Sequence, residues 1–286
     1  FLFITSTSLY GVWIKPAYTS ITILNCSGEI PNKTPCLIEA DQYKINISRI
    51  DICQENPFPN YRINPDFFSS KCINLLDKKI LKKYDLNNLE IPQELNSQGE
   101  YKYISLILEN KFLVSGQYKS EGYFWNTSNK GPTNIISSRD QDGKPEVFVK
   151  RLRNWRGKEN TDNKYCSNNG GTFSRCDLNY NGYKLSAIGL SSDFIENYGN
   201  KTKHMFFLSE LSPRFILSND SSKYLELKYQ KKLEVYGDGK SVKSISIAPF
   251  IFETKFRNKS LSNWIKNIGG KLISGNLKLK MGDLLF

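Results

Sequence analysis

Hydrophobic residues recur mostly at every second position, in short runs that are separated by turn residues. In the stretch 225–229, three apolar side chains alternate with Glu226 and Lys228. This pattern predicts a half-buried strand with Glu226 facing solvent. The strand continues into Gly237-Asp238-Gly239, whose glycines can adopt positive φ and therefore predict a tight turn into a returning strand over 242–252.

Other segments extend this pattern along the chain. The apolar runs 101–108 and 112–118 are separated by Glu109-Asn110-Lys111, which predicts a hairpin. Within 43–53 the alternation shifts phase, which indicates a bulge. Helical periodicity is scarce, and the segment 72–84 predicts a short amphipathic helix.

The expected fold class is mainly β, with antiparallel sheets of the β-sandwich type, an extended N-terminal strand and little helix. We expect an N-terminal arm over 1–18, a first β-rich lobe over 19–130 and a second over 131–286, because 126–145 is polar and rich in turn residues. The sequence leaves open whether these lobes are two units or one.

The N-terminal arm, FLFITSTSLYGVWI, is apolar and rich in β-branched and aromatic residues. It has two interpretations: a strand of the mature chain, which we favour, or the hydrophobic region of a secretory signal. As a strand it could pair within its own domain or insert into the open sheet edge of a second copy. The residues that would then contact the neighbouring copy are Phe1, Phe3, Leu9, Val12 and Ile14.

Six cysteines fall into three close pairs, each bracketing a loop-like segment. The pairs are Cys26 with Cys36, Cys53 with Cys72, and Cys166 with Cys176. None has the Cys-x₂₋₄-Cys spacing typical of zinc sites, so we expect disulfides, no metal and no cofactor. Neighbour pairing is the simplest of the fifteen connectivities that six cysteines allow. Disulfides indicate an oxidising compartment, and we expect a secreted protein at the cell surface.

Forty Lys and Arg against 28 Asp and Glu give a net charge of +12. Such a charge favours contact with polyanions, which include cell-surface glycans. The densest basic segment, 144–158, also contains Trp155, but we expect a solvated lysine-rich surface and not a nucleic-acid site. No apolar run approaches the ~20 residues that span a bilayer, so a membrane-spanning chain is not expected.

Motifs for catalysis are weak. His204 is the single histidine, it begins an apolar run, and no serine lies in a Gly-x-Ser-x-Gly motif. Pairs of carboxylates have no distinguishing context, so we expect no enzyme. Tyr123 and Trp125 could stack on a sugar ring, although aromatic residues in such runs more often fill a sheet core.

Three segments carry a resemblance to known proteins: FLFITSTSLYGVWI, YKINISRIDIC and YISLILENKFLVSGQY. In these the chain resembles exported, disulfide-bonded, β-rich surface proteins of AT-rich bacteria, similar to pilin or fibre subunits. The resemblance implies an exported surface protein and supplies no catalytic residues.

The favoured function is therefore a structural subunit of an extracellular filament, pilus or surface fibre, which pairs with further copies of itself through the N-terminal arm. The alternative is a monomeric carbohydrate-binding or adhesive module. A secreted hydrolase is a third alternative.

Overall fold

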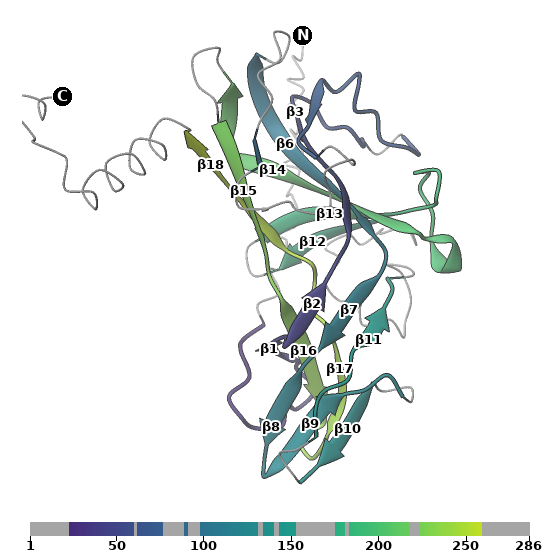
Figure 1. Ribbon diagram of the computed structural model, residues 1–286, viewed down its shortest axis with the longest axis vertical. Helices are drawn as coiled ribbons and strands as arrows, with labels where there is room; N and C mark the ends of the chain where they lie inside the picture. Colours follow the sequence, from purple (N-terminus) through teal and green to yellow (C-terminus); the bar gives the residue numbers. More distant parts are fainter. Residues whose placement is uncertain are drawn as a thin grey trace, which may run out of the picture.

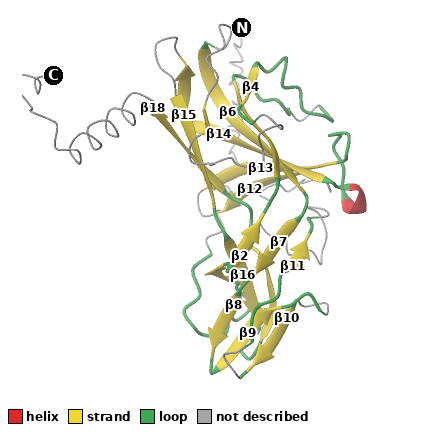
Figure 2. Ribbon diagram, in the orientation of Figure 1, coloured by secondary structure: helices red, strands yellow, loops and turns green. Residues whose placement is uncertain are grey.

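The structure of the chain is a computed structural model, which describes most residues between Ile23 and Asn258. The described ranges are 23–59, 62–76, 89–90, 98–130, 134–139, 143–152, 175–180, 183–217 and 223–258. Strands dominate these ranges, and helix in them is confined to the 3₁₀ turn Gly199–Lys201 (Figure 2). Neighbouring strands within each sheet are antiparallel. The prediction of a mainly β chain with antiparallel sheets and little helix is confirmed.

The largest sheet has six strands in the order β12-β13-β14-β6-β3-β4. Its two central strands pair from His204 opposite Glu109 to Leu217 opposite Gly99, with a register shift between Glu210 and Phe215. The strands are β3 (Ile47–Cys53), β4 (Cys72–Asn74), β6 (Gly99–Glu109), β12 (Arg175–Tyr180), β13 (Tyr183–Leu190) and β14 (His204–Leu217).

Four three-stranded sheets make up the rest of the described fold, in the orders β1-β16-β17, β11-β7-β2, β10-β9-β8 and β18-β15-β5. Their strands are β1 (Cys36–Glu39), β2 (Gln42–Lys44), β5 (Leu89–Glu90), β7 (Phe112–Ser115), β8 (Gln117–Ser120), β9 (Tyr123–Thr127), β10 (Ile135–Ser138), β11 (Phe148–Lys150), β15 (Lys223–Tyr229), β16 (Lys232–Gly237), β17 (Val242–Ile247) and β18 (Phe252–Asn258).

The molecule is elongated, and four pairs of consecutive strands run from one half of its length into the other (Figure 1). The pairs are β2 with β3, β6 with β7, β15 with β16, and β17 with β18, each separated by two to four residues. Strands from both sides of residue 130 pair directly, as β1 does with β16 and β6 with β14. Each half of the molecule therefore contains strands from both of the segments 19–130 and 131–286.

An aromatic cluster lies near the short gaps that separate the two strands of each of these four consecutive pairs. We call it the waist cluster. Its rings belong to Tyr43, Phe112, Phe207, Tyr229 and Phe250, with neighbouring centroids 4.9–6.4 Å apart. Phe112, Tyr229 and Phe250 lie within or next to an interruption, and Tyr43 is one residue further away. Phe207 comes from the large sheet. All belong to or pack against the main hydrophobic core, so the cluster joins the two halves of the molecule.

The hairpin predicted at 109–111 is wrong. β6 pairs with β3 and β14, whereas β7 pairs with β2 and β11, so the chain continues past residue 110 without reversing. The physical reason is the side chain of Asn110, which is only 3% exposed. Its amide donates to the carbonyls of Leu152 at 2.7 Å and Thr202 at 3.1 Å, and its oxygen accepts from the Leu152 N–H at 2.8 Å. This residue therefore connects three segments.

Other local predictions have mixed outcomes. Gly237-Asp238-Gly239 does join the antiparallel strands β16 and β17, and Gly239 has a φ of 80°. The bulge predicted in 43–53 corresponds to the gap between β2 and β3 and a register shift after Ile47. The helix predicted over 72–84 is wrong at its start, because Cys72–Asn74 is strand β4; residues 77–84 lie outside the described residues.

Two of the predicted disulfides are present among the described residues, Cys26–Cys36 and Cys53–Cys72. Cys176 is fully buried in β12 and is also disulfide-bonded, but its predicted partner Cys166 lies outside the described residues. None of the helices in the described part of the chain is long and apolar enough to cross a membrane.

We expect Asn110→Ala to lower the free energy of unfolding by about 2–4 kcal/mol, because three buried backbone groups lose their partner. Urea unfolding followed by tryptophan fluorescence measures this change. Asn129→Ala is the matched control, since Asn129 is exposed. Equal stabilities of the two variants would contradict the role assigned to Asn110.

Candidate functional site

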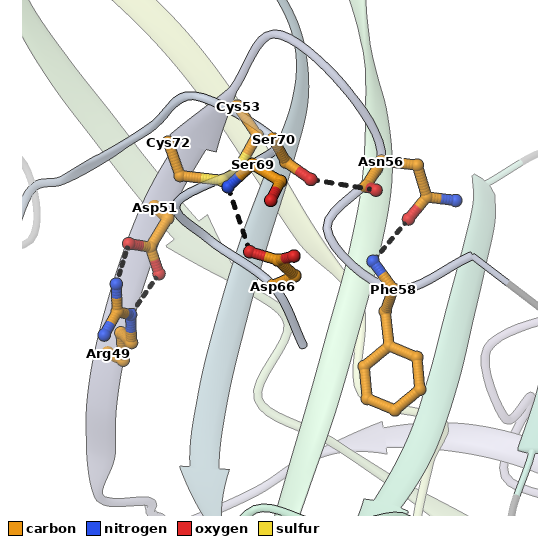
Figure 3. The surroundings of a disulfide bond; sticks show 9 residues. All are labelled: Arg49, Asp51, Cys53, Asn56, Phe58, Asp66, Ser69, Ser70 and Cys72. Carbon is orange, nitrogen blue, oxygen red and sulfur yellow. Dashed lines mark hydrogen bonds and ion pairs between the residues drawn. A yellow bond between two sulfur atoms is a disulfide. The ribbon is translucent and has the colours of Figure 1, made fainter. Parts of the chain in front are cut away.

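The most organised feature outside the main core is the loop between Cys53, which ends β3, and Cys72, which begins β4; the disulfide between these two residues closes it (Figure 3). Its described residues are 54–59 and 62–71. We call it the stapled loop. It covers the second face of the six-stranded sheet, where its Phe58 and Phe67 pack against Phe206 with centroids 5.2 and 6.5 Å apart. The large sheet is thus covered on both faces, which accounts for the continuous hydrophobic run in β6.

Hydrogen bonds within the stapled loop fix its backbone. The Asn56 side-chain oxygen accepts from the Phe58 N–H at 2.8 Å, and the Ser70 hydroxyl donates to the Asn56 carbonyl at 3.2 Å (Figure 3). The Asp66 carboxylate accepts from the Ser69 N–H at 2.9 Å, and this bond lowers the pKa of Asp66. A loop with this many internal bonds presents its remaining side chains in fixed positions.

Two arginines contact the loop on the same face of the sheet, one from β3 and the other from β12. The Arg49 guanidinium lies 3.8 Å from the centroid of Phe67 and donates two bonds, of 2.7 and 2.9 Å, to Asp51. Arg175 on β12 lies 4.8 Å from the centroid of Phe58 and donates to Glu196 at 2.7 Å. Each phenylalanine therefore packs under a cation that is fixed by a carboxylate.

These arginines occupy one row across the sheet. The strand register places Arg175 beside Ile188, then Phe206, Ile107 and finally Arg49. The apolar centre of the row contacts the loop, and its charged ends enclose the loop.

Burial raises the pKa of Asp51 to about 6, although the hydrogen bonds and charge of Arg49 act in the opposite direction. The carboxyl is fully buried at the edge of the loop. The free-energy cost of removing its charge from water is larger than the stabilisation of that charge by the hydrogen bonds and positive charge of Arg49. In the folded protein Asp51 therefore takes up a proton at a pH at which unfolded Asp is still ionised.

The stapled loop also exposes apolar side chains. Phe68 is 94% exposed and Ile63 is 63% exposed. Ile195, on the neighbouring loop, is 44% exposed, and the adjacent Glu196 N–H donates to the Ile63 carbonyl at 2.6 Å. Exposed apolar side chains on a rigid loop are typical of contact surfaces.

The predicted sugar-contact residues lie on β9, far along the chain from this loop. Tyr123 and Trp125 project from the same face of β9, with centroids 6.1 Å apart and an interplanar angle of 42°. Trp125 packs against the main core, and its indole N–H is buried without an acceptor. The Tyr123 hydroxyl accepts two bonds from Arg139, at 2.8 and 3.1 Å. Only Tyr123 thus has the environment of a surface ring.

The predicted arm residues Phe1, Phe3, Leu9, Val12 and Ile14 lie outside the described residues. The described chain begins at Ile23, whose side chain is 5% exposed and belongs to the main core. Leu24 to Cys26 then run alongside β1 in parallel, where the Leu37 N–H donates to the Leu24 carbonyl and the Cys26 N–H to the Leu37 carbonyl, both at 2.9 Å. Asn25 therefore forms a parallel bridge with Leu37 at the edge of β1.

No group of three His, Cys, Asp or Glu residues that could hold a metal ion occurs in the described ranges. His204 is the first residue of β14, as predicted, and its Nδ1 lies 3.2 Å from the Ser191 carbonyl. The prediction that Glu226 faces solvent is wrong, because its side chain is only 6% exposed and its carboxylate pairs with Lys228 at 2.8 Å.

Comparisons of the chain with family models, curated proteins and solved structures find no match. The chemistry and geometry of its own residues are therefore the basis for assigning a function.

Sequence reasoning missed Arg49, Asp51, Phe58, Phe67 and Arg175. One signal was present: Arg49 and Asp51 alternate with Ile50 and Ile52, immediately before a cysteine. Charged residues at every second position of a buried strand indicate a face that is covered by polar partners. The position of Arg175 opposite them depends on the register of five strands, which no local pattern reveals.

The raised pKa of Asp51 predicts a specific pH dependence of stability. Between pH 4 and 6 the folded state binds more protons than the unfolded state, so this residue's contribution to stability falls as the pH rises. From pH 4.5 to 7 the loss is about 2 kcal/mol. Asparagine does not titrate, so Asp51→Asn removes this loss. When urea unfolding is measured at pH 4.5 and at pH 7, the free energy of unfolding of the wild type should fall by about 2 kcal/mol more than that of the variant.

The exposed residue Asp193 provides the control, as Asp193→Asn changes the net charge equally. Parallel stability profiles for the wild type and Asp51→Asn would contradict the assignment.

Proposed function

We propose that the protein is a structural subunit of an extracellular filament, in which the N-terminal arm of one copy adds as a strand to a sheet of the next. The observation that carries the proposal is the parallel pairing of Leu24 to Cys26 with β1. These residues lie shortly after the arm in the sequence and form a backbone contact at a sheet edge. An apolar, β-prone segment preceding such a contact is suited to strand addition, in which backbone bonds supply affinity and alternate side chains supply specificity.

Sheet edges that could accept a strand occur in several places. β10, β11 and β17 are outermost in their sheets, and no further strand pairs with their outer edges in the described part of the chain. Ile136 on β10 and Val149 on β11 are 48% and 45% exposed. An unprotected edge with exposed β-branched side chains favours pairing with another strand.

The disulfides support an oxidising location for this assembly. Cys26–Cys36 joins the segment around Cys26 to the first residue of β1. A strand donated from one copy to a different surface of the next is a heterologous contact. Repeated contacts of this kind produce an open filament unless the rotation closes a ring.

Deletion of residues 1–14 should convert polymers into monomers, because it removes the donated strand and leaves Ile23 and the Cys26–Cys36 disulfide in place. Negative-stain electron microscopy and sedimentation velocity, with full-length protein at the same concentration, measure the change. Polymerisation of the deleted chain at the wild-type rate would overturn the proposal.

A synthetic peptide with the sequence of Phe1 to Ile14 distinguishes strand addition from other roles of the arm. Added in excess, it should occupy the acceptor edge and shorten the filaments of full-length protein. A peptide of the same composition in scrambled order is the control.

A carbohydrate-binding or adhesive module is the second candidate, and the observation that favours it is the Tyr123 ring, held by Arg139 beside Trp125. This function predicts that Tyr123→Ala and Trp125→Ala each weaken binding on a glycan array at least tenfold. Tyr236→Ala is the control, since Tyr236 is a partly exposed aromatic residue on β16. Unchanged binding by Tyr123→Ala, which leaves the core intact, would exclude this role for β9.

A further inference from the structure

Three segments far apart in the sequence meet at the buried side chain of Asn110. Besides the bonds to Leu152 and Thr202, the Asn110 N–H donates to the Lys203 carbonyl at 2.8 Å. Leu152 and Thr202 are themselves buried, at 7% and 5% exposed. The end of β6, the residues after β11 and the residues before β14 are thus held together at one side of the waist (Figure 1).

The chain neighbours of these buried residues are cations. Lys111 follows Asn110, Arg151 precedes Leu152, and Lys201 and Lys203 flank Thr202. Arg151, Lys201 and Lys203 are exposed, whereas Lys111 is partly exposed. The bonds of Asn110 hold the backbone of these three segments close together, so the fold brings the four cations to neighbouring positions. We call the surface formed by Lys111, Arg151, Lys201 and Lys203 the basic surface.

The basic surface has little compensating negative charge. None of its four cations forms an ion pair within the described ranges, whereas Arg49, Arg175 and Arg214 elsewhere are paired. The carboxylate nearest in sequence is Glu109, which accepts from the Asn46 amide at 2.7 Å. Like charges brought together repel one another, so the fold bears a cost here that a bound polyanion would remove.

We infer that the basic surface binds an anionic polysaccharide, with sulfate or carboxylate groups spaced along an extended chain. Its cations come from three segments and lie on an open surface, which suits a polymer that contacts several of them at once. Each contact releases a counterion, so affinity grows with the number of charges neutralised and falls with salt.

Two observations favour a polysaccharide over a nucleic acid. The segments 109–111, 150–152 and 201–203 contain no aromatic residue on which a base could stack. The disulfides indicate an oxidising compartment, where anionic polysaccharides are the abundant polyanions of cell surfaces. This inference is independent of filament assembly, because it uses neither the arm nor a sheet edge.

The test uses the full-length chain and the triple variant Lys111→Gln/Arg151→Gln/Lys203→Gln. The probe is heparin, with neutral dextran as the uncharged comparison, and binding is measured by isothermal titration calorimetry at several salt concentrations. We expect heparin affinity to fall at least tenfold in the triple variant, with a shallower dependence on salt and no binding of dextran to either protein.

A matched variant, Lys33→Gln/Lys130→Gln/Lys240→Gln, removes the same net charge at three exposed lysines away from this surface. It should bind heparin within about threefold of the wild type, because general electrostatic attraction contributes less than the local contacts. An equal loss in both triple variants, or no loss in the first, would overturn the inference. Tighter binding of single-stranded DNA than of heparin, lost in the first variant, would replace it with a nucleic-acid site.

Filament formation should be unchanged in the first triple variant, as judged by electron microscopy. The inference about the basic surface and the proposal of strand addition can therefore fail separately.

Discussion

The waist cluster is the contact on which the rest of the structure depends. Four strand pairs pass from one half of the molecule to the other, and each is interrupted beside Tyr43, Phe112, Tyr229 or Phe250. The rings, with neighbouring centroids 4.9–6.4 Å apart, pack beside the gaps between consecutive strands. This packing fixes the direction of each strand beyond its gap. Burial also raises the pKa of the Tyr43 hydroxyl, so the cluster carries no charge.

Polar contacts determine what surrounds this apolar centre. Asn110 connects β6 to β7 without the expected hairpin, and its side chain bonds to backbone groups of Leu152 and Thr202 instead. The same contact brings three segments together and so creates the basic surface. On the six-stranded sheet, two arginines and the Cys53–Cys72 disulfide hold the stapled loop. The loop buries Phe58 and exposes Phe68.

The proposed assembly contact and the basic surface involve different residues, which has a consequence for a filament. Each added subunit would carry one further basic surface, so a polymer would contact a long anionic chain at many points. Weak individual contacts then combine into strong overall binding, provided that the chain can span neighbouring surfaces. A protein at a cell surface can in this way bind a polysaccharide tightly through subunits that each bind weakly.

The sequence by itself determined the class of fold and the pairing of the described disulfides, because alternation and close cysteine spacing are local properties. It also determined the turn at Gly237-Asp238-Gly239, where the glycines allow the required backbone. Only the tertiary structure decided that Glu226 is buried, that Asn110 is no turn, and that Arg49 and Arg175 lie in one row. These depend on the register of strands such as β3 with β6 and β6 with β14, whose paired residues are some 50 to 120 positions apart in the sequence. The free energy of such pairing is shared among many contacts that no short segment contains.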